Sequence, residues 1–497
     1  MFGLPSLNNS KAKDFPKDFV WLNTDRPLSL EDLRGYVVIL DFWTYCCINC
    51  MHTLPDLEWI EKKYHGKPVV VIGVHSAKFY NEQEAENVRE AIGRYEISHP
   101  VIVDRNMEIW ESYGVSGWPT LVVIDPKGNV IYQQSGEGQR ENLDDVISVL
   151  LERNKEILAK EPIVIKRPAA PSTRTLSYPG KLSLSPSGKM LAVSDSNHNR
   201  ILVIDVSSGK IIYKIGSGTK GLRDGTFEQA RFFRPQGVLW VAEEIYVADT
   251  ENHALREINL KSGTVKTLAG DGKQGYWVQS TQDARVTRLS SPWDLAYDRG
   301  FIFIAMAGLH QIWTYHIETN KIGPFAGSGY ENIVDGQLER AQFAQPSGLS
   351  ISGRYLFVAD SEVSAVRRID LDSKTVETVV GEGLFIFGHS DGPLDSARLQ
   401  HPLGVACGDG RIYVADTYNH AIRLVDLIEK KVSTLVGRPE TKAVCNINDP
   451  SCDTLGLYEP SDVKVHGNTL YISDTNNHLI RIYDLEKNVL KTLTVRE

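Results

Sequence analysis

The chain has 497 residues, of which 42% are hydrophobic and 24% are charged, and its formal net charge is −9. This length predicts more than one domain, and the acidic balance argues against the basic face of a typical nucleic-acid-binding protein. No apolar run approaches the length of a membrane-spanning helix, so we expect no membrane span. The first residues lack the basic and apolar segments of a secretory signal.

In chain order, we expect an N-terminal extension over residues 1–14 and then an α/β domain over residues 15–158. An apolar strand pattern at 37–43 precedes Cys47-Ile48-Asn49-Cys50, and a helical pattern follows it. A Cys-x-x-Cys at a strand-to-helix turn of an α/β chain predicts a dithiol redox site.

The two cysteines differ in their expected roles. Only a thiolate attacks a disulfide, and a free cysteine is mostly protonated at neutral pH. At the first turn of the helix, Cys47 would face unpaired N–H groups and the positive end of the helix dipole, which stabilise a thiolate. Cys50, one turn further on, could then attack the mixed disulfide. We therefore assign Cys47 as the nucleophile and Cys50 as the resolving thiol.

Two other interpretations of the motif stay open. A zinc half-site would need two further Cys or His ligands at matching spacing, and no second Cys-x-x-Cys or His-x-x-x-His occurs. The second is a scaffold that keeps a redox fold without redox chemistry, because fold does not imply function. Cys46 is interpreted as a small packed side chain, since a bond to the adjacent Cys47 would be strained. We expect no metal and no other cofactor.

Three parts of the α/β domain form one motif: Asp41-Phe42-Trp43, the two cysteines and Trp118-Pro119-Thr120. It resembles the thioredoxin superfamily, and the extra helix expected over 81–95 is similar to its peroxiredoxin and TlpA-like branch. The resemblance implies that Asp41 is a buried acid that helps to deprotonate the resolving cysteine. It also implies a cis peptide before Pro119, so that Trp118, Pro119 and Thr120 would bind an extended substrate beside the dithiol.

A Pro- and Ala-rich linker over residues 159–177 leads to a repeat over residues 178–497. Its units return about every 56 residues, and each contains four short strands, which is typical of a propeller blade. We therefore predict a multidomain chain in which an α/β thioredoxin-like fold precedes an all-β, six-bladed β-propeller. The units start at Pro179, Pro235, Pro292, Pro346, Pro402 and Pro460.

Three units carry Asp-x-x-Asn-His-x-x-Arg, beginning at Asp249, Asp416 and Asp474, and this pattern resembles the NHL repeat. Unit three keeps His310 without the acid, and unit four has Ser364 in place of the histidine. One interpretation is a histidine ring for metal binding or catalysis. We favour the other, in which each Asp, His and Arg ties strands within its own blade, because a repeat encodes the stability of its own unit.

The remaining cysteines bear on the compartment. Cys407 is expected in a strand, and Cys445 and Cys452 bracket a turn-rich segment. Two free thiols are the simpler interpretation of that pair, with a disulfide as the alternative. Because the chain has few cysteines and three of them lie at one motif, we expect a reducing, cytoplasmic location.

A TlpA-like thioredoxin domain followed by six NHL units resembles the NHL-repeat-containing protein 2 family. The dithiol then predicts a thiol–disulfide oxidoreductase whose propeller binds or presents a protein substrate or partner. The alternative is a non-enzymatic interaction scaffold with a structural or redox-sensing thioredoxin-like domain. No nucleic-acid partner is expected, because the acidic balance offers no phosphate-binding surface.

Overall fold

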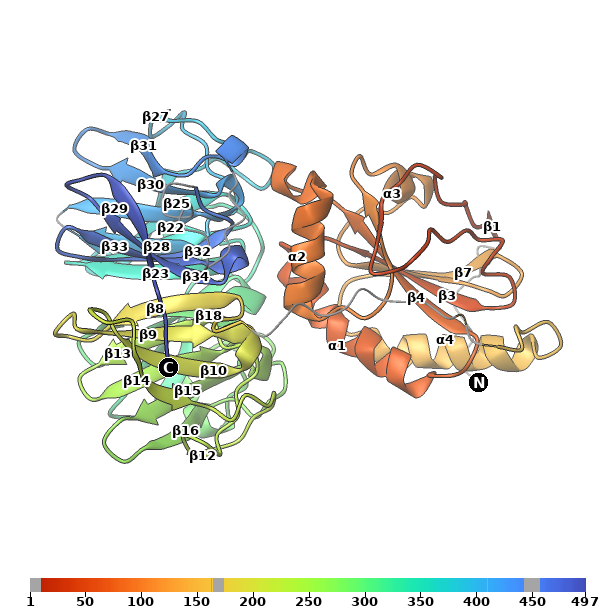
Figure 1. Cartoon of the computed structure of the whole chain (residues 1–497), viewed down its shortest axis with the longest axis horizontal. Coiled ribbons are helices and arrows are strands. Elements are labelled where there is room, and N and C mark those ends of the chain that lie inside the picture. The colour runs from red at the N-terminus through yellow and green to blue at the C-terminus, as the bar shows by residue number, and fades with distance from the viewer. Residues whose placement is uncertain (1–9, 162, 164–173, 409, 442–455) are drawn as a thin grey trace. The chain divides into compact units, whose positions relative to one another are not determined.

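The computed structural model describes residues 10–161, 163, 174–408, 410–441 and 456–497. The chain divides between residues 172 and 173 into two compact units, which are described separately (Figure 1). The first is a thioredoxin-like α/β unit and the second is a six-bladed β-propeller, as predicted.

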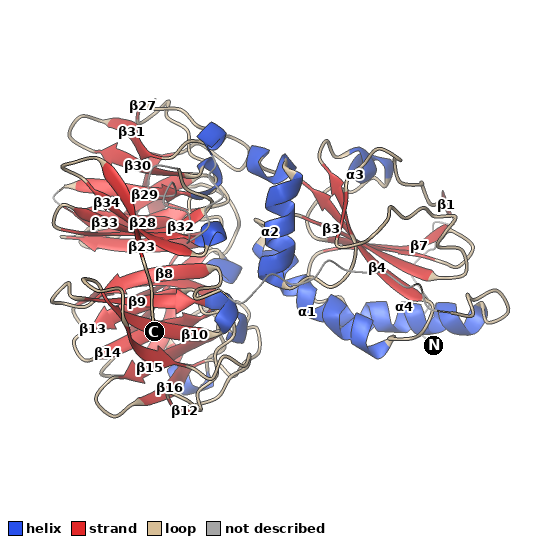
Figure 2. Ribbon diagram, viewed as in Figure 1, coloured by secondary structure: helices blue, strands red, loops and turns tan. Residues whose placement is uncertain are grey.

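The first unit is built on a mixed sheet with the strand order β1-β7-β6-β3-β4-β5-β2 (Figure 2). Its central strand β3 pairs in parallel with β4 and antiparallel with β6. Ser10 and Lys11, which the sequence places in the N-terminal extension, form an edge strand on β7. The elements are β1 (Ser10–Lys11), β2 (Trp21–Leu22), β3 (Val37–Trp43), α1 (Ile48–Lys63), β4 (Val69–Ser76), η1 (Tyr80–Gln83), α2 (Ala85–Tyr95), β5 (Val101–Asp104), α3 (Glu108–Ser112), β6 (Thr120–Ile124), β7 (Asn129–Ser135) and α4 (Arg140–Arg153).

Strand β3 is buried on both faces, which explains its continuous apolar run. Leu40 and its neighbours on one face pack in a cluster with Trp110 of α3. Ile39 on the other face packs with Leu57 of α1 and residues of α4. Because side chains alternate along a strand, Asp41 lies on the face that α1 covers. The apolar pattern therefore positions the carboxyl beneath the helix that carries the dithiol.

In the second unit, antiparallel sheets form a ring through contacts between neighbouring inner strands. Blade one comprises β8 (Pro179–Leu184), β9 (Met190–Asp195), β10 (Arg200–Asp205) and β11 (Ile211–Ile215); blade two, β13 (Gly237–Val241), β14 (Glu244–Asp249), β15 (Ala254–Asn259) and β16 (Thr264–Ala269); blade three, β18 (Pro292–Asp298), β19 (Phe301–Met306), β20 (Gln311–His316) and β21 (Lys321–Ala326). Blade four comprises β23 (Pro346–Ser352), β24 (Tyr355–Asp360), β25 (Ala365–Asp370) and β26 (Thr375–Val380); blade five, β28 (Gly404–Gly408), β29 (Arg411–Asp416), β30 (Ala421–Asp426) and β31 (Lys431–Val436); blade six, β32 (Pro460–His466), β33 (Thr469–Asp474), β34 (Leu479–Asp484) and β35 (Val489–Leu493).

Short 3-10 helices follow the second strand of several blades, and all of these lie at one end of the propeller (Figure 2), which we call the helical face. The short helices among the described residues of this unit are η2 (Ser196–His198), η3 (Thr250–Asn252), η4 (Ala284–Val286), η5 (Ala307–Leu309), η6 (Thr417–Asn419), η7 (Pro439–Thr441) and η9 (Thr475–Asn477).

Blades two to five each gain a fifth strand at the outer edge, contributed by the segment that leads into the blade. In three of them this strand begins at the glycine of an Asp-Gly pair. In blade one, the penultimate residue Arg496 lies beside the outer strand instead: Ile211 N donates to Arg496 O at 2.9 Å. The chain end thus contacts the first blade. The outer strands are β12 (Gly225–Thr226), β17 (Gln282–Asp283), β22 (Gly336–Gln337) and β27 (Gly392–Pro393).

The repeated Asp and Arg act within their own blade, as predicted. In blade two, Arg256 Nη1 donates to Asp249 Oδ2 at 2.7 Å, and Arg256 Nη2 donates to Asp224 Oδ1 at 3.0 Å. Arg367 and Arg423 make the equivalent bonds in blades four and five. These three arginines are fully buried, so each guanidinium fastens the segment before the blade to the strands inside it.

The prediction that the repeated histidines also act within their own blade is wrong. Ser291 N, at the start of blade three, donates to His253 Nδ1 of blade two at 3.0 Å. The backbone of His253 is left-handed, with φ 49°, and this turn directs the ring toward the next blade. His310, His420 and His478 make the same bond to the blade that follows, at 3.0 to 3.1 Å.

Two blades lack the histidine but keep the bond between neighbouring blades. Asn199 Oδ1 accepts from Arg234 N at 3.0 Å, and Ser364 Oγ accepts from His401 N at 3.1 Å. Every junction in the ring is therefore closed by one backbone N–H and one side-chain acceptor.

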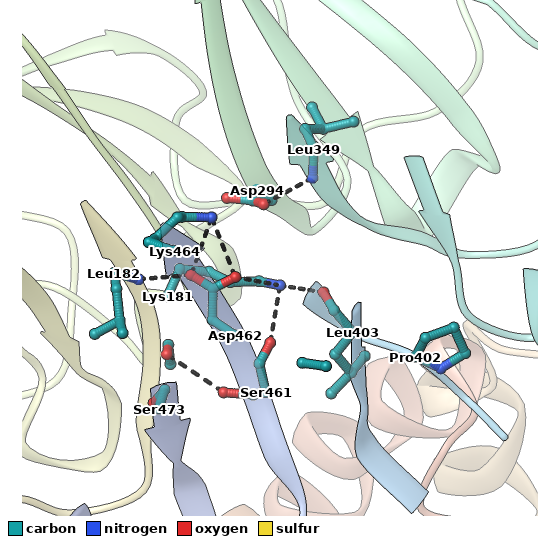
Figure 3. A network of polar contacts seen from close by, with 12 residues as sticks. Lys181, Leu182, Asp294, Leu349, Pro402, Leu403, Ser461, Asp462, Lys464 and Ser473 are labelled. Atoms are coloured by element: carbon teal, nitrogen blue, oxygen red, sulfur yellow. Dashed lines mark hydrogen bonds and ion pairs between the residues drawn. The ribbon is translucent and has the colours of Figure 1, made fainter. Parts of the chain in front are cut away.

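Charged side chains of the first strands of three blades meet in one polar network (Figure 3). Lys181 Nζ of blade one donates to Ser461 O at 3.1 Å and to Leu403 O, and it lies 3.9 Å from Asp462 Oδ1. Asp462 Oδ2 also accepts from Leu182 N at 2.9 Å. The side chains of Lys181 and Asp462 are fully buried, and an unpaired charge there would be costly. These contacts link blade one to blades five and six.

A second carboxylate extends this network across the ring. Asp294 Oδ2 of blade three accepts from Leu349 N of blade four at 2.8 Å. Burial raises the pKa of Asp294, and the charges of Lys464 and Lys181 oppose that rise. Lys464 Nζ donates to Asp462 Oδ1 at 3.1 Å. The two lysines and two aspartates therefore balance in charge.

We expect His420→Ala to lower the free energy of unfolding of the propeller by about 1–3 kcal/mol, because Glu459 N–H would lose its buried acceptor. His420→Asn should lose less, because asparagine fills this role at Asn199 and tolerates a left-handed backbone. Chemical denaturation followed by tryptophan fluorescence measures both. The alkylation rate of Cys47 should be the same in both variants. Loss of that reactivity with an unchanged unfolding midpoint would argue for a functional histidine ring.

Candidate functional site

The dithiol lies where β3 gives way to α1. Cys47 is the residue before the first turn of α1, with an extended backbone (φ −80°, ψ 118°). Its carbonyl accepts from Cys50 N at 3.1 Å and from Met51 N at 3.2 Å, and so begins the helix. Cys47 is half-buried, whereas Cys50 is only 2% exposed. The more accessible sulfur is therefore the one at the helix N-terminus, in the position predicted for the nucleophile.

Cys50 is held in its protonated form. Burial raises the pKa of the Cys50 thiol well above its usual range, and the neighbouring Cys47 and the charge of Asp41 raise it further. A thiol in this state attacks a disulfide only when a nearby base takes its proton. The resolving role assigned to Cys50 thus requires a proton acceptor close by.

Asp41 is the carboxyl that lies beneath the pair. It is 1% exposed, and in the part of the chain that the structure describes neither of its oxygens has a hydrogen-bond partner. Burial raises the pKa of Asp41 to about 7, while the charge of His99 acts in the opposite direction. A carboxyl that titrates near neutrality can both accept and release a proton at physiological pH. The acid implied by the resemblance to thioredoxins is present and buried.

The Trp118–Pro119 peptide is cis, as the resemblance implied. Trp118 Nε1 donates to Ser76 O at 3.0 Å, which fixes the indole against the end of β4. Thr120 pairs with Phe42 at the end of β3. Its buried hydroxyl donates to Gly117 O at 2.7 Å, so this side chain is occupied within the unit. A substrate beside the dithiol would meet the backbone of this segment and the partly buried Trp118.

A buried carboxylate that the sequence did not reveal holds the loop before the dithiol. Glu82 Oε1 accepts from Cys46 N at 2.9 Å, and Glu82 Oε2 accepts from Lys78 N and Phe79 N at 3.0 Å. Cys46 itself is fully buried, in line with a packed side chain. Glu82 lies in η1, at the start of the inserted helical segment expected over 81–95. In the sequence, the only indication of this role of Glu82 was that an acidic residue lies in the inserted segment.

Two buried histidines near the dithiol were also missed. The ring of His75 on β4 lies 4.9 Å from that of Trp43 and stacks at 5.4 Å on that of Tyr45. Burial lowers the pKa of His75 to about 3, so this ring is neutral. His99 lies before β5, with Nδ1 3.5 Å from Glu61 Oε2. Neither residue belongs to a motif, and each acquires its surroundings only through the fold.

Other sequence expectations have simpler outcomes. Cys407 lies in β28, where burial raises the pKa of its thiol to about 12. Cys445 and Cys452 lie outside the described residues. Within the described ranges, no three His, Cys, Asp or Glu residues are grouped so as to hold a metal ion. None of the described helices is long and apolar enough to cross a membrane.

Known proteins resemble both units. A thioredoxin-like family model matches residues 35–130, an NHL repeat model matches 399–423, and an LVIVD repeat model matches 345–364 and 459–482. Protein SUPPRESSOR OF QUENCHING 1, chloroplastic, of Arabidopsis thaliana is 44% identical over 495 residues, which cover 95% of this chain and 46% of that protein. The chain therefore spans less than half the length of this plant relative.

Two further relatives cover different shares of the chain. NHL repeat-containing protein 2 of Gallus gallus is 41% identical over 521 residues, which cover 97% of this chain and 71% of that protein. Thiol-disulfide oxidoreductase ResA of Bacillus thuringiensis subsp. konkukian is 29% identical over 136 residues, which cover 27% of this chain and 76% of that protein. The first match includes both units, and the second matches the span of a single domain.

We expect iodoacetamide to alkylate Cys47 at least about tenfold faster than Cys50 at neutral pH, because Cys47 is more accessible and burial raises the pKa of Cys50. The rates are compared in Cys50→Ser, which leaves Cys47, and in Cys47→Ser, which leaves Cys50. Both are made in a Cys46→Ser background and read by peptide mass spectrometry. Faster labelling of Cys50 would reverse the two assigned roles.

Proposed function

This chain belongs to the family of NHL repeat-containing protein 2, and we propose that it is a thiol–disulfide oxidoreductase acting through Cys47 and Cys50. One observation carries the proposal: a half-buried thiol at a helix N-terminus, a fully buried thiol one turn on, and a buried carboxyl beneath them. The named activity of the relative ResA, which resembles this chain in part, supports the same chemistry.

The reaction has two steps. The Cys47 thiolate attacks a substrate disulfide, forms a mixed disulfide with one substrate sulfur and releases the other as a thiolate. Cys50 then gives its proton to Asp41 and attacks Cys47 Sγ, which releases the second substrate thiolate and leaves a Cys47–Cys50 disulfide. The substrate gains two electrons and the dithiol loses two. A cellular dithiol reductant would restore the starting state.

We propose that the substrate is a protein whose extended segment lies against residues 118–120, beside Cys47. The pairing of Thr120 with Phe42 places this backbone at the end of β3. A cytoplasmic location, expected from the cysteine usage, would keep the dithiol reduced and ready to act.

The propeller is proposed to bind a partner protein, and this would hold even if the chain were a non-enzymatic scaffold with a structural or redox-sensing thioredoxin-like unit. The supporting observation is a group of exposed aromatic side chains on the loops between blades two and five. Aromatic side chains are enriched at protein interfaces, and loops on a rigid scaffold commonly carry recognition. The exposed aromatic side chains are Tyr276, Trp277, Tyr330 and Phe385, with exposed fractions of 75%, 54%, 73% and 70%.

We expect the full chain to accelerate the reduction of insulin by dithiothreitol, because Cys47 and Cys50 would exchange with insulin disulfides. Cys47→Ser should lower the rate at least about tenfold, whereas Cys46→Ser, the control, should retain it. After mild oxidation, peptide mass spectrometry should find the 47–50 bond as the main product. Two free thiols after oxidation would contradict the enzymatic proposal and favour the scaffold.

We expect a photo-crosslinking amino acid at Trp277 to capture protein rather than RNA in cells, because the exposed loops are aromatic and the chain is acidic. The same group at Lys487, in the turn after β34 at the other end of the blade, is the control. Purified protein should give no gel shift with single-stranded RNA at physiological salt. Sub-micromolar, sequence-dependent RNA binding would overturn the protein-partner proposal.

A further inference from the structure

Unpartnered polar atoms gather behind the dithiol. Such atoms are rare in protein interiors, where nearly all polar groups find protein or water partners. They come from neighbouring parts of one sheet face, and that face is the one on which Asp41 lies. Among the described residues, the buried atoms without a hydrogen-bond partner include both carboxyl oxygens of Asp41, Trp43 Nε1, both ring nitrogens of His75 and His99 Nε2.

Gly73 brings two of these groups together with Asp41. It lies directly opposite Asp41 in the parallel pairing of β3 and β4. A Cβ atom on Gly73 would come within 2.9 Å of Trp43 Nε1 and 3.4 Å of His99 Nε2. The glycine therefore leaves room beside Asp41 into which both nitrogens extend, and His99 is close enough to act on the charge of Asp41.

The other side of the His99 ring faces a route to solvent. Its Nδ1 lies 3.5 Å from Glu61 Oε2, and the exposed fraction rises from 3% at the His99 side chain to 23% at Glu61. Asn23 Nδ2 donates to His99 O at 2.9 Å, which fixes the backbone. Ser98 Oγ donates to Glu61 Oε2 at 2.7 Å and fixes the carboxylate. A carboxyl, an imidazole and a second carboxyl thus form a row from the dithiol to the surface.

We propose that His99 and Glu61 conduct to solvent the proton that Asp41 takes from Cys50. This inference rests on the proposed dithiol chemistry. Asp41 and His99 Nε2 are not hydrogen-bonded to each other, so a water in the space beside Gly73 carries the proton of Asp41 to Nε2. The ring then gives its Nδ1 proton to Glu61, which exchanges it with water. One proton leaves for each disulfide formed, and no electrons move along this row.

The reverse half-reaction resets the ring. After one outward transfer, His99 carries its proton on Nε2 instead of Nδ1. Reduction of the Cys47–Cys50 disulfide requires a proton at Cys50, and this proton enters from Glu61 through Nδ1 while Nε2 returns its own to Asp41. Each catalytic cycle therefore restores the first tautomer without a rotation of the buried ring.

His75, the other histidine on this face, does not fit the role. It is fully buried, aromatic rings of Trp43 and Tyr45 lie against it, and its pKa is lowered to about 3. The titratable groups around Asp41 are therefore Cys47 and Cys50 from α1, His75 from β4 and His99 from the segment before β5. Of these, His99 has a carboxylate on its outer side.

The resolving step can be measured directly in the full chain with a Cys46→Ser background. Reduced protein is mixed with an aromatic disulfide reagent that releases a coloured thiolate. Attack by Cys47 releases the first thiolate, and attack by Cys50 on the mixed disulfide releases the second. Stopped-flow absorbance then separates the two phases over a range of pH.

In His99→Gln, we expect the first phase to be unchanged and the second to slow at least about tenfold at pH 7. Glu61→Gln should slow the same phase. In His99→Ala, added imidazole should restore the second phase in proportion to its concentration, which a purely structural role would not produce. His65→Gln, at an exposed histidine of the same unit, is the matched control and should behave like the parent.

Two outcomes overturn the relay alone: equal second phases in the parent and in His99→Gln, or a slowed phase in His99→Ala that imidazole does not restore. A third outcome would also contradict the proposed oxidoreductase function. If the parent itself shows no second phase, Cys50 does not resolve the mixed disulfide, and the proposed oxidoreductase function falls together with this inference.

Discussion

One kind of contact recurs at every junction of the propeller, the hydrogen bond from the residue before each blade's first proline to a side chain of the previous blade. The donors have left-handed backbones, with φ between 42° and 59°. This conformation is unfavourable for a residue other than glycine, and the residue before a proline normally prefers an extended one. It persists because the N–H finds a buried acceptor and because the next strand must begin there. The donors are Tyr178, Arg234, Ser291, Gln345, His401 and Glu459.

In the thioredoxin-like unit, two buried carboxylates, Glu82 and Asp41, differ in whether they accept hydrogen bonds from the backbone. Glu82 accepts from the backbone of Cys46 and from that of Lys78 and Phe79, just before the inserted segment, and so fixes the loop that presents Cys47. Asp41 is buried without such bonds. One carboxylate is therefore satisfied and structural, while the other is left free to change its protonation. Glu82 therefore holds the dithiol loop in place, and Asp41 is the carboxyl available for proton transfer.

Much of this arrangement could be predicted because its signals are local. The apolar run of β3, the spacing of Cys47 and Cys50 and the return of a proline in every blade follow from neighbouring residues. The histidine contacts could not, because their direction depends on a left-handed backbone. Lys181 and Ser461 are separated by 280 residues, and His99 and Glu61 by 38. Such pairs have no periodicity, and only the closed fold brings them together.

The burial of Asp41 also has an energetic consequence for the unit that contains it. Burial raises the pKa of Asp41 to about 7 in the folded chain, against 3.8 for an exposed aspartate. The folded state then holds a proton that the unfolded state has lost, so stability is greatest below the lower value and declines as pH rises through the higher one. The full difference corresponds to about 4 kcal/mol. The thioredoxin-like unit is thus less stable at alkaline pH because it holds, under its dithiol, a carboxyl whose pKa lies near neutrality.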